Sequence, residues 1–302
     1  MRRFKGYFFI LGATLFWGIS ATVAKFLFTR QVNTLVLVQT RMTISCLIML
    51  TFFLLWKPGV LRVRPKDLVK FGALGIFGSA GSNFTYYTTI KEINVATAIL
   101  LQYLAPLLVL AYAAITKEER ITSTRIGAAV VSLVGCFLAV GADRVTFSAM
   151  SNIGLLTGFS SAFCWGFANI MIRHLLRKYS VWTTLCYSFL AASLFWLCIN
   201  PPWTLIAEVE PASMWGILSL FAVSSILIPH SLYYSGAQYL TASQSIITGT
   251  AEPIVAISSA FVLIGESLSG LQLLGATLVI VAIMLLQLKD QSEQPLQPEP
   301  VP

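Results

Sequence analysis

Ten stretches of about 20 mostly apolar residues follow one another along the chain, and short connections between them hold most of the charged side chains. An α-helix needs about 20 apolar residues to cross the hydrocarbon core of a bilayer. The pattern therefore predicts an all-α integral membrane protein with ten transmembrane helices, at residues 6–28, 34–56, 68–90, 95–115, 124–142, 153–172, 181–199, 213–233, 242–264 and 269–288.

The composition supports a membrane protein, because 57% of the 302 residues are hydrophobic and only 11% are charged. A soluble domain carries about 25% charged residues. The basic N-terminus leads into an apolar run that is too long for a signal peptide and lacks a clear cleavage site, so we interpret it as an uncleaved first span. The polar, proline-rich residues 289–302 are predicted to form a disordered cytoplasmic tail.

The lysines and arginines alternate between the two ends of the predicted helices. Of the 20 basic residues, 15 fall in the terminal segments and connections of one side, although the net charge is only +8. Positive connections mark the cytoplasmic side, so both termini are predicted to be cytoplasmic, in a multi-pass protein of the plasma (inner) membrane. Because the basic residues lie in short gaps and form no polar face, nucleic-acid binding is not expected.

Segments of the first half return in the second half at an offset of 147 to 148 residues. "FWGISATVAK" (16–25) matches "CWGFANIMIR" (164–173), and "ATAILLQYLAPLLVL" (96–110) matches "SQSIITGTAEPIVAI" (243–257). We expect two five-helix repeats, at 1–145 and 150–288. Because five is odd, the repeats would be inverted in the membrane, as in secondary transporters. A duplicated structural bundle without transport is the alternative.

These residues resemble the drug/metabolite transporter superfamily, in particular its EamA-like group of ten-helix carriers. The resemblance is carried by the "WG" of the first and sixth spans, Lys25, Arg41 in "LVQTRMTIS", "LAP" in the fourth span, "AEP" in the ninth and "GESLSGLQLLG". It covers residues 6 to 288 and departs at "ITKEER". The resemblance implies five plus five helices around a central cavity, alternating access, and movement of small metabolites, commonly amino-acid export.

Two matched prolines, Pro106 and Pro253, fall near the middle of the fourth and ninth spans. A proline inside a helix frees a backbone carbonyl one turn earlier and kinks the helix. In transporters, helices broken at the midplane form binding sites. Each proline is therefore expected to kink its helix, either as part of the transport cycle or as a static feature of packing.

Two charged residues lie inside spans. Glu252 is the acidic residue well inside a span, where a charge costs about 2.5–3.5 kcal/mol and normally faces a cavity or a partner. Glu252 is interpreted as a carrier of protons, a site for a substrate ammonium, or a carboxyl that fastens the ninth helix. Arg41 is interpreted as a partner of Glu252, a site for a substrate carboxylate, or a side chain that snorkels or binds backbone carbonyls.

Further polar and aromatic side chains occupy matched depths. Asn83 and Tyr87 share a helix face at i and i+4, as do His230 and Tyr234. Hydrogen bonding within the protein, interfacial anchoring and packing are the alternative roles for these residues. The predicted cavity lining is Trp17, Arg41, Asn83, Tyr87, Gln102, Trp165, Asn169, His230, Tyr234, Thr248 and Glu252.

The functional hypothesis is a secondary-active transporter that exports a small metabolite such as an amino acid, in contact with the lipid bilayer and its substrate, and driven by protons or by the substrate gradient. Multidrug efflux is the alternative within transport, and a non-transporting scaffold or an intramembrane enzyme is the alternative outside it. No catalytic or nucleotide-binding motif occurs in the chain, so an enzyme, a cofactor and a metal site are not expected.

Overall fold

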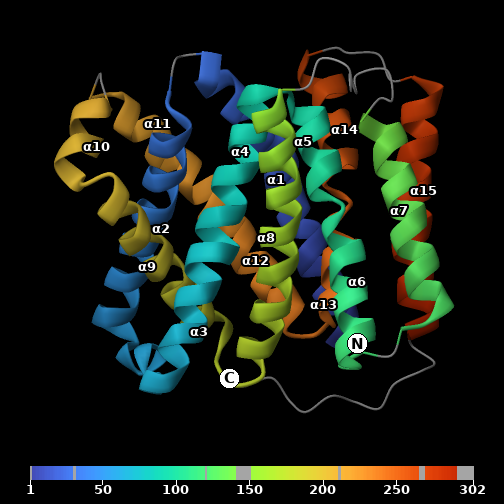
Figure 1. The fold of residues 1–302 in the computed structure, drawn as a ribbon, viewed down its shortest axis with the longest axis horizontal. Coiled ribbons are helices and arrows are strands. Elements are labelled where there is room, and N and C mark those ends of the chain that lie inside the picture. The colour runs from blue at the N-terminus through green and yellow to red at the C-terminus, as the bar shows by residue number, and fades with distance from the viewer. Residues whose placement is uncertain are drawn as a thin grey trace.

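The computed structural model describes residues 2–29, 32–119, 121–140, 151–209, 212–264 and 269–290, and within these ranges it contains helices and no strand (Figure 1). Residues 291–302 of the predicted tail, residues 141–150 and residues 265–268 of the stretch "GESLSGLQLLG" lie outside the described residues, as does the side chain of Lys25. The elements are α1 (Arg2–Thr29), α2 (Thr34–Trp56), η1 (Pro58–Leu61), η2 (Pro65–Asp67), α3 (Leu68–Ala73), η3 (Leu74–Gly81), α4 (Ser82–Glu92), α5 (Val95–Gln102), α6 (Ala105–Thr116), α7 (Ser123–Val140), α8 (Asn152–Leu176), α9 (Val181–Ile199), α10 (Pro202–Glu208), α11 (Met214–Ala222), η6 (Val223–Leu227), α12 (Ile228–Ala237), α13 (Ala242–Gly249), α14 (Glu252–Ile264) and α15 (Gly270–Asp290).

Several helices begin where a polar side chain caps them. Asn33, Asn94, Ser151 and Ser180 accept hydrogen bonds from backbone amides in the first turns of α2, α5, α8 and α9. Thr241 forms a capping box with Gln244 at the start of α13. These caps satisfy backbone amides that a helix leaves without a partner. The polar residues at the ends of the apolar stretches therefore mark where these helices begin.

Eight segments within the described residues are long and apolar enough to cross a membrane. They are Arg3–Phe28, Thr34–Trp56, Val95–Thr116, Ser123–Val140, Asn152–Leu176, Val181–Ile199, Met214–Ala237 and Gly270–Gln287. The expected spans 68–90 and 242–264 instead fall on α3–η3–α4, which is rich in serine and threonine, and on the interrupted pair α13–α14. The chain is therefore a multi-pass helical membrane protein.

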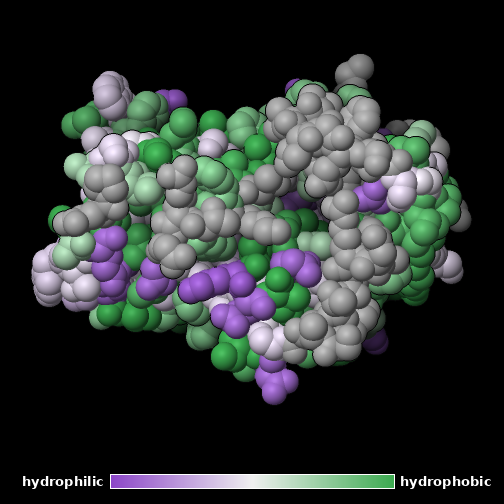
Figure 2. Space-filling view, turned by 90° about the horizontal axis from the view of Figure 1, so that it is seen from above, coloured by the Kyte–Doolittle hydropathy of each residue, from purple (hydrophilic) through white to green (hydrophobic). Residues whose placement is uncertain are grey.

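The outer flanks of the bundle are apolar. Phe8, Leu156, Phe163 and Leu220 are each more than two-thirds exposed. Seen from above, the right-hand flank is almost entirely hydrophobic, whereas hydrophilic residues gather toward the middle and left of the visible face (Figure 2). Such large exposed apolar surfaces are suited to contact with lipid.

Helices α7 and α15 pack side by side, at the right of Figure 1, and join the two halves of the sequence. Their backbones approach closely at Gly135 and Gly275. A Cβ atom added at Gly135 would lie 2.8 Å from the carbonyl oxygen of Gly275 and 3.0 Å from the amide nitrogen of Val279. Both of these are backbone atoms, so the crossing requires glycine.

Polar contacts join the two halves at the lower face of Figure 1, where α1 begins and α15 ends. The Glu119 carboxylate accepts hydrogen bonds from the Ala242 amide at 2.9 Å, from the Ser243 hydroxyl and from Arg125 at 3.2 Å. It thereby caps α13, which belongs to the other half. Nearby, Nε2 of His174 lies 3.0 Å from Glu118. We call Glu118, Glu119, Arg125, His174 and Ser243 the lower cluster.

A second contact between the halves lies on the same face, around Asp67. Tyr179 donates a hydrogen bond of 2.7 Å to the Asp67 carboxylate, and Lys178 and Lys70 lie 3.9 and 3.7 Å from it. The hydrogen bond from Tyr179 lowers the pKa of Asp67 below its ordinary value; burial opposes this effect, and the lysines reinforce it. The ionised carboxylate therefore stabilises this contact.

We expect Gly135→Ala to lower the free energy of unfolding by about 1–3 kcal/mol, because the new methyl group would push the α7 and α15 backbones apart. The control is Gly127→Ala in the same helix, where an added Cβ meets nothing within 4 Å. The control should be neutral or should stabilise the helix by up to about 1 kcal/mol. Melting temperatures of the purified proteins in detergent measure both effects, and equal behaviour of the two variants would contradict close packing at Gly135.

The stability of the protein is expected to depend on pH through Asp67. Because its folded-state pKa is lowered, the stabilisation is fully present above the unfolded-state pKa and is lost as the pH falls through the folded-state value. Asp67→Asn should lower the melting temperature at neutral pH and reduce the further loss on acidification. Tyr179→Phe should move that loss to higher pH. An acid profile of Asp67→Asn identical to that of the wild type would exclude this contribution.

Candidate functional site

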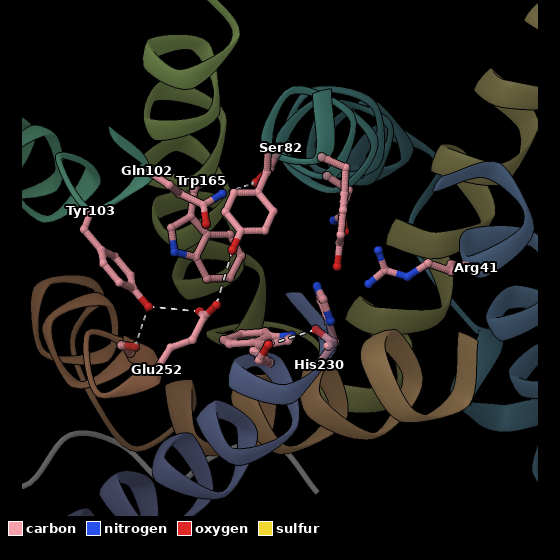
Figure 3. Close-up of a pocket in the computed structure, with 13 residues that line it drawn as sticks. Arg41, Ser82, Gln102, Tyr103, Trp165, His230 and Glu252 are labelled. Atoms are coloured by element: carbon pink, nitrogen blue, oxygen red, sulfur yellow. Dashed lines mark hydrogen bonds between the residues drawn. The ribbon is translucent and has the colours of Figure 1, made fainter. Parts of the chain in front are cut away.

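A pocket lies deep in the bundle, between helices from both halves of the sequence (Figure 3). The first half contributes side chains from α1, α2, α4, α5 and the turn after α5, and the second half contributes from α8, α12, α13 and α14. The empty space between them, which includes the open solvent at the mouth of the pocket, is about 540 Å³. The lining residues are Trp17, Ser20, Arg41, Ser82, Asn83, Tyr86, Tyr87, Gln102, Tyr103, Trp165, His230, Gly249 and Glu252.

The pocket is bordered by two helix interruptions, each immediately before a proline. Helix α5 ends at Gln102 and α6 begins at Ala105, followed by Pro106. Helix α13 ends at Gly249 and α14 begins at Glu252, followed by Pro253. Both prolines thus lie in the first turn of a new helix, where a missing amide hydrogen is tolerated. Regular helical hydrogen bonding is thus interrupted just before each proline, although Val95–Thr116 remains a single apolar span.

The break before Pro253 exposes a backbone acceptor to the pocket. In a continuous helix the carbonyl of Gly249 would accept a hydrogen bond from residue 253, but proline has no N–H to donate. The Tyr103 hydroxyl lies 3.0 Å from this carbonyl and 2.9 Å from the Glu252 carboxylate, so its single hydrogen is shared between the two acceptors. Tyr103 itself lies in the turn between α5 and α6. The two breaks, one from each half, therefore contact each other.

Glu252 is the first residue of α14 and is 7% exposed. Its carboxylate accepts a hydrogen bond from Tyr103 at 2.9 Å and a long one from Tyr86 at 3.5 Å. Burial disfavours an ionised carboxyl here, whereas these phenols and the positive end of the α14 dipole favour it. Among the lysines and arginines whose side chains are described, none forms an ion pair with Glu252.

Arg41, on α2, approaches the pocket from the side opposite Glu252 (Figure 3). Its side chain is 1% exposed. Nε donates to the Ser225 hydroxyl at 2.8 Å and Nη2 to the Ser225 carbonyl at 3.1 Å, whereas Nη1 has no hydrogen-bond partner. The guanidinium carbon lies 4.5 Å from the ring centroid of Tyr87 and 4.8 Å from that of Phe221. Ser225 thus fixes the guanidinium, and the Tyr87 phenol is a further polar group beside it.

Aromatic rings form a further wall of the pocket. The ring of Trp17 lies 5.6 Å from Trp165 and 5.3 Å from His230, in both cases edge to face. Tyr233 packs 5.2 Å from both tryptophans and donates a hydrogen bond to Asn169. These contacts stabilise the ring positions and join α1 to α8 and α12.

The residues expected from the sequence divide into two groups. Trp17, Arg41, Asn83, Tyr87, Gln102, Trp165, His230 and Glu252 all line the pocket. Asn169, Tyr234 and Thr248 are buried but are not among the lining residues. Asn169 binds Tyr233 and the Trp165 carbonyl, and Thr248 donates to the Gln244 carbonyl within its own helix.

Five lining residues were not in the predicted set: Ser20, Ser82, Tyr86, Tyr103 and Gly249. Ser20 follows Trp17 by three residues and shares its helix face, and Tyr86 is the neighbour of Tyr87, so spacing could have found both. Tyr103 and Gly249 reach the pocket only because the helices are broken beside them. Within the described ranges, no group of three or more histidine, cysteine, aspartate or glutamate residues could hold a metal ion.

Among the curated proteins it resembles, the chain is 25% identical over 290 residues to YicL of Salmonella typhimurium, an inner membrane transporter; the match covers 95% of this chain and 96% of YicL. It is 24% identical to the threonine/homoserine exporter RhtA of Escherichia coli, over 81% of this chain and 78% of RhtA. It is 26% identical to a probable terminal-alkyne amino-acid exporter of Streptantibioticus cattleyicolor, over 76% of each chain.

The fold also has a counterpart among solved crystal structures. One of them superposes with a TM-score of 0.73 at 21% sequence identity, covering 94% of this chain and 98% of the other. The EamA-like transporter family matches the sequence twice, at residues 4–141 and 152–288. These two ranges include nearly all of the described helices and every residue that lines the pocket. The resemblance seen in the sequence is thereby confirmed: the chain belongs to the EamA-like transporter family.

Proposed function

We propose that this protein is a secondary transporter that exports a small metabolite, with amino acids as the first candidates, through the central pocket by alternating access. The observation that carries the proposal is the position of the pocket, which takes its walls from both halves of the chain. A site between two halves can face either side of the membrane in turn when the halves rock against each other. The pocket combines hydrogen-bonding groups, aromatic rings and two formal charges.

The proposed architecture is ten membrane passes in two inverted five-helix repeats, at 1–145 and 150–288, followed by a disordered tail. The family matches the chain once in each half. The breaks before Pro106 and Pro253, which lie 147 residues apart in the numbering, also support the repeats. In this arrangement α3–η3–α4 and α13–α14 supply the two expected passes that are not among the eight long apolar helices.

The proposed cycle opens the lower face by separating the contacts between the halves. Glu119 would leave the start of α13, and Asp67 would leave Tyr179. The interruptions before Pro106 and Pro253 provide places where the helices can bend without breaking further hydrogen bonds. The lower face is proposed to be cytoplasmic, because most of the lysines and arginines lie in its connections.

Export of an amino acid is supported by the names of two of the relatives, which are exporters of threonine and homoserine and, probably, of a terminal-alkyne amino acid. Their identity to this chain is low, so the names indicate a class of solute and leave the particular substrate open. Multidrug efflux of large apolar cations would use the Glu252 carboxylate and would leave the buried guanidinium of Arg41 without a role in binding.

The transport proposal is tested with the purified full chain in liposomes. We expect counterflow of at least one labelled amino acid above that of protein-free liposomes, and faster flux when a pH gradient is imposed if protons drive export. Panels of amines and drugs serve as the comparison. Absence of flux for every amino acid, amine and drug, in protein that retains its melting transition, would overturn the proposal.

The proposed orientation is tested by labelling with a thiol reagent that does not cross the membrane. Lys66 on the lower face and Thr204 in α10 on the upper face are both exposed. In intact cells Thr204→Cys should be labelled, whereas Lys66→Cys should be labelled only after lysis. The reverse pattern would show that the lower face, where α1 begins and α15 ends, is external.

A further inference from the structure

The two formal charges that line the pocket do not neutralise each other. No ion pair joins Arg41 to Glu252, and the two residues lie on opposite sides of the pocket (Figure 3). Both are almost fully buried, at 1% and 7% exposure. A buried charge without an ionic partner is unfavourable, so this arrangement is suited to a ligand that brings the missing partners.

Building on the transport function proposed above, we infer that the pocket recognises its substrate as a zwitterion, with the carboxylate on Arg41 and the ammonium on Glu252. A ligand with both groups supplies a counterion at each side of the pocket and adds no net charge. A ligand with one of the two groups leaves the other buried charge uncompensated, and a neutral ligand leaves both.

Arg41 has the properties of a carboxylate site. Ser225 fixes the guanidinium through two hydrogen bonds, and Tyr87 and Phe221 lie within 5 Å of it. Nη1 is buried and makes no hydrogen bond of standard geometry, and the Tyr87 phenol lies beside the guanidinium, so a donor is already oriented before the substrate arrives. A carboxylate oxygen accepts strongly from a guanidinium in this geometry, and a rigid site loses little entropy on binding.

Glu252 has the properties of an ammonium site. Tyr103 and Tyr86 hold its carboxylate in one orientation, and each carboxylate oxygen keeps further capacity to accept. The adjoining lining includes the Gly249 carbonyl and the rings of Tyr86 and Trp17. Carbonyl oxygens and aromatic faces both attract an ammonium group.

Each charged residue is fixed by the opposite half of the chain. Arg41 belongs to the first half and is held by Ser225 of the second. Glu252 belongs to the second half and is held by Tyr86 and Tyr103 of the first. Movement of one half against the other therefore alters both subsites together, which links binding of the zwitterion to the change of access.

The test uses three sets of analogues that share a side chain and differ only in charge. They are leucine, isoamylamine and 4-methylpentanoate; phenylalanine, phenethylamine and 3-phenylpropanoate; and threonine, 1-amino-2-propanol and 3-hydroxybutanoate. Binding to the detergent-solubilised full chain is measured by the shift in melting temperature with ligand concentration. In at least one set the zwitterion should bind the wild type roughly 10- to 100-fold more tightly than either analogue. The reason is that the amine lacks the contact with Arg41 and the carboxylate lacks the contact with Glu252.

Variants assign the two subsites. Arg41→Gln should remove the preference for the zwitterion over the amine, and Glu252→Gln should remove the preference over the carboxylic acid. Matched controls are Thr40→Val and Thr248→Val, whose hydroxyls bond only to carbonyls within their own helices and are buried away from the pocket. Both controls should keep the wild-type ratios.

The ratio of affinities separates recognition from stability. If Arg41 and Glu252 are purely structural, their variants lose melting temperature while the ratios stay unchanged, which overturns the inference. Should Arg41→Gln fail to fold, the affinities of the wild type still test the inference. Single-charge analogues that bind the wild type as tightly as the zwitterion in all three sets would also overturn the inference. In that case flux of such analogues in liposomes would leave the transport function standing.

Discussion

A proline cannot donate a backbone hydrogen bond, and this constraint shapes the centre of the protein. At Pro253 the Gly249 carbonyl loses its helical partner, and Tyr103 from the other half of the chain takes that place. The same hydroxyl also lies 2.9 Å from the carboxylate of Glu252, and its one hydrogen is shared between the carbonyl and the carboxylate. The missing N–H thus leads to a helix break, a contact between the halves and an oriented charge, all within a few residues. Pro106 interrupts the matching helix in the first half.

Interrupted helices are acceptable in a membrane only where the freed polar groups find partners within the protein or face a cavity. Here both breaks border the pocket, and the surrounding helices shield them from lipid. The outer surface remains apolar, with large exposed side chains such as Phe163 and Leu220. The irregular backbone is therefore confined to the polar pocket where a solute would bind, and the surface that faces lipid stays apolar.

Contacts between the halves differ in chemistry from one place to another. The α7–α15 crossing at Gly135 and Gly275 is a close backbone contact with little freedom to move. The lower cluster and the Asp67 contact instead consist of hydrogen bonds and ion pairs that water can replace. This difference provides a rigid joint and a separable face in the same molecule. Such a combination suits rocking of two halves about a fixed edge.

Much of the architecture followed from the sequence, because the length of an apolar stretch and the position of its polar ends are local properties. The apolar spans and the family resemblance could both be read from the order of residues along the chain. Hydropathy identified the pass at α3–η3–α4 less clearly, because this segment contains many serines and threonines, several of which are buried in the protein. Depth in a span also singled out Arg41, Glu252, Trp17 and Trp165, all of which line the pocket.

Tertiary structure decided which of these groups meet. The sequence by itself left open whether Arg41 pairs with Glu252, and the fold keeps them apart, with Ser225 and Tyr103 as their separate partners. It also brings Tyr103 and Gly249 to the pocket, although they are 146 residues apart in the chain. Local pattern determines which segments are helical and how deep a residue lies, whereas the partner of a buried charge depends on the packing and rotation of helices that are distant in sequence.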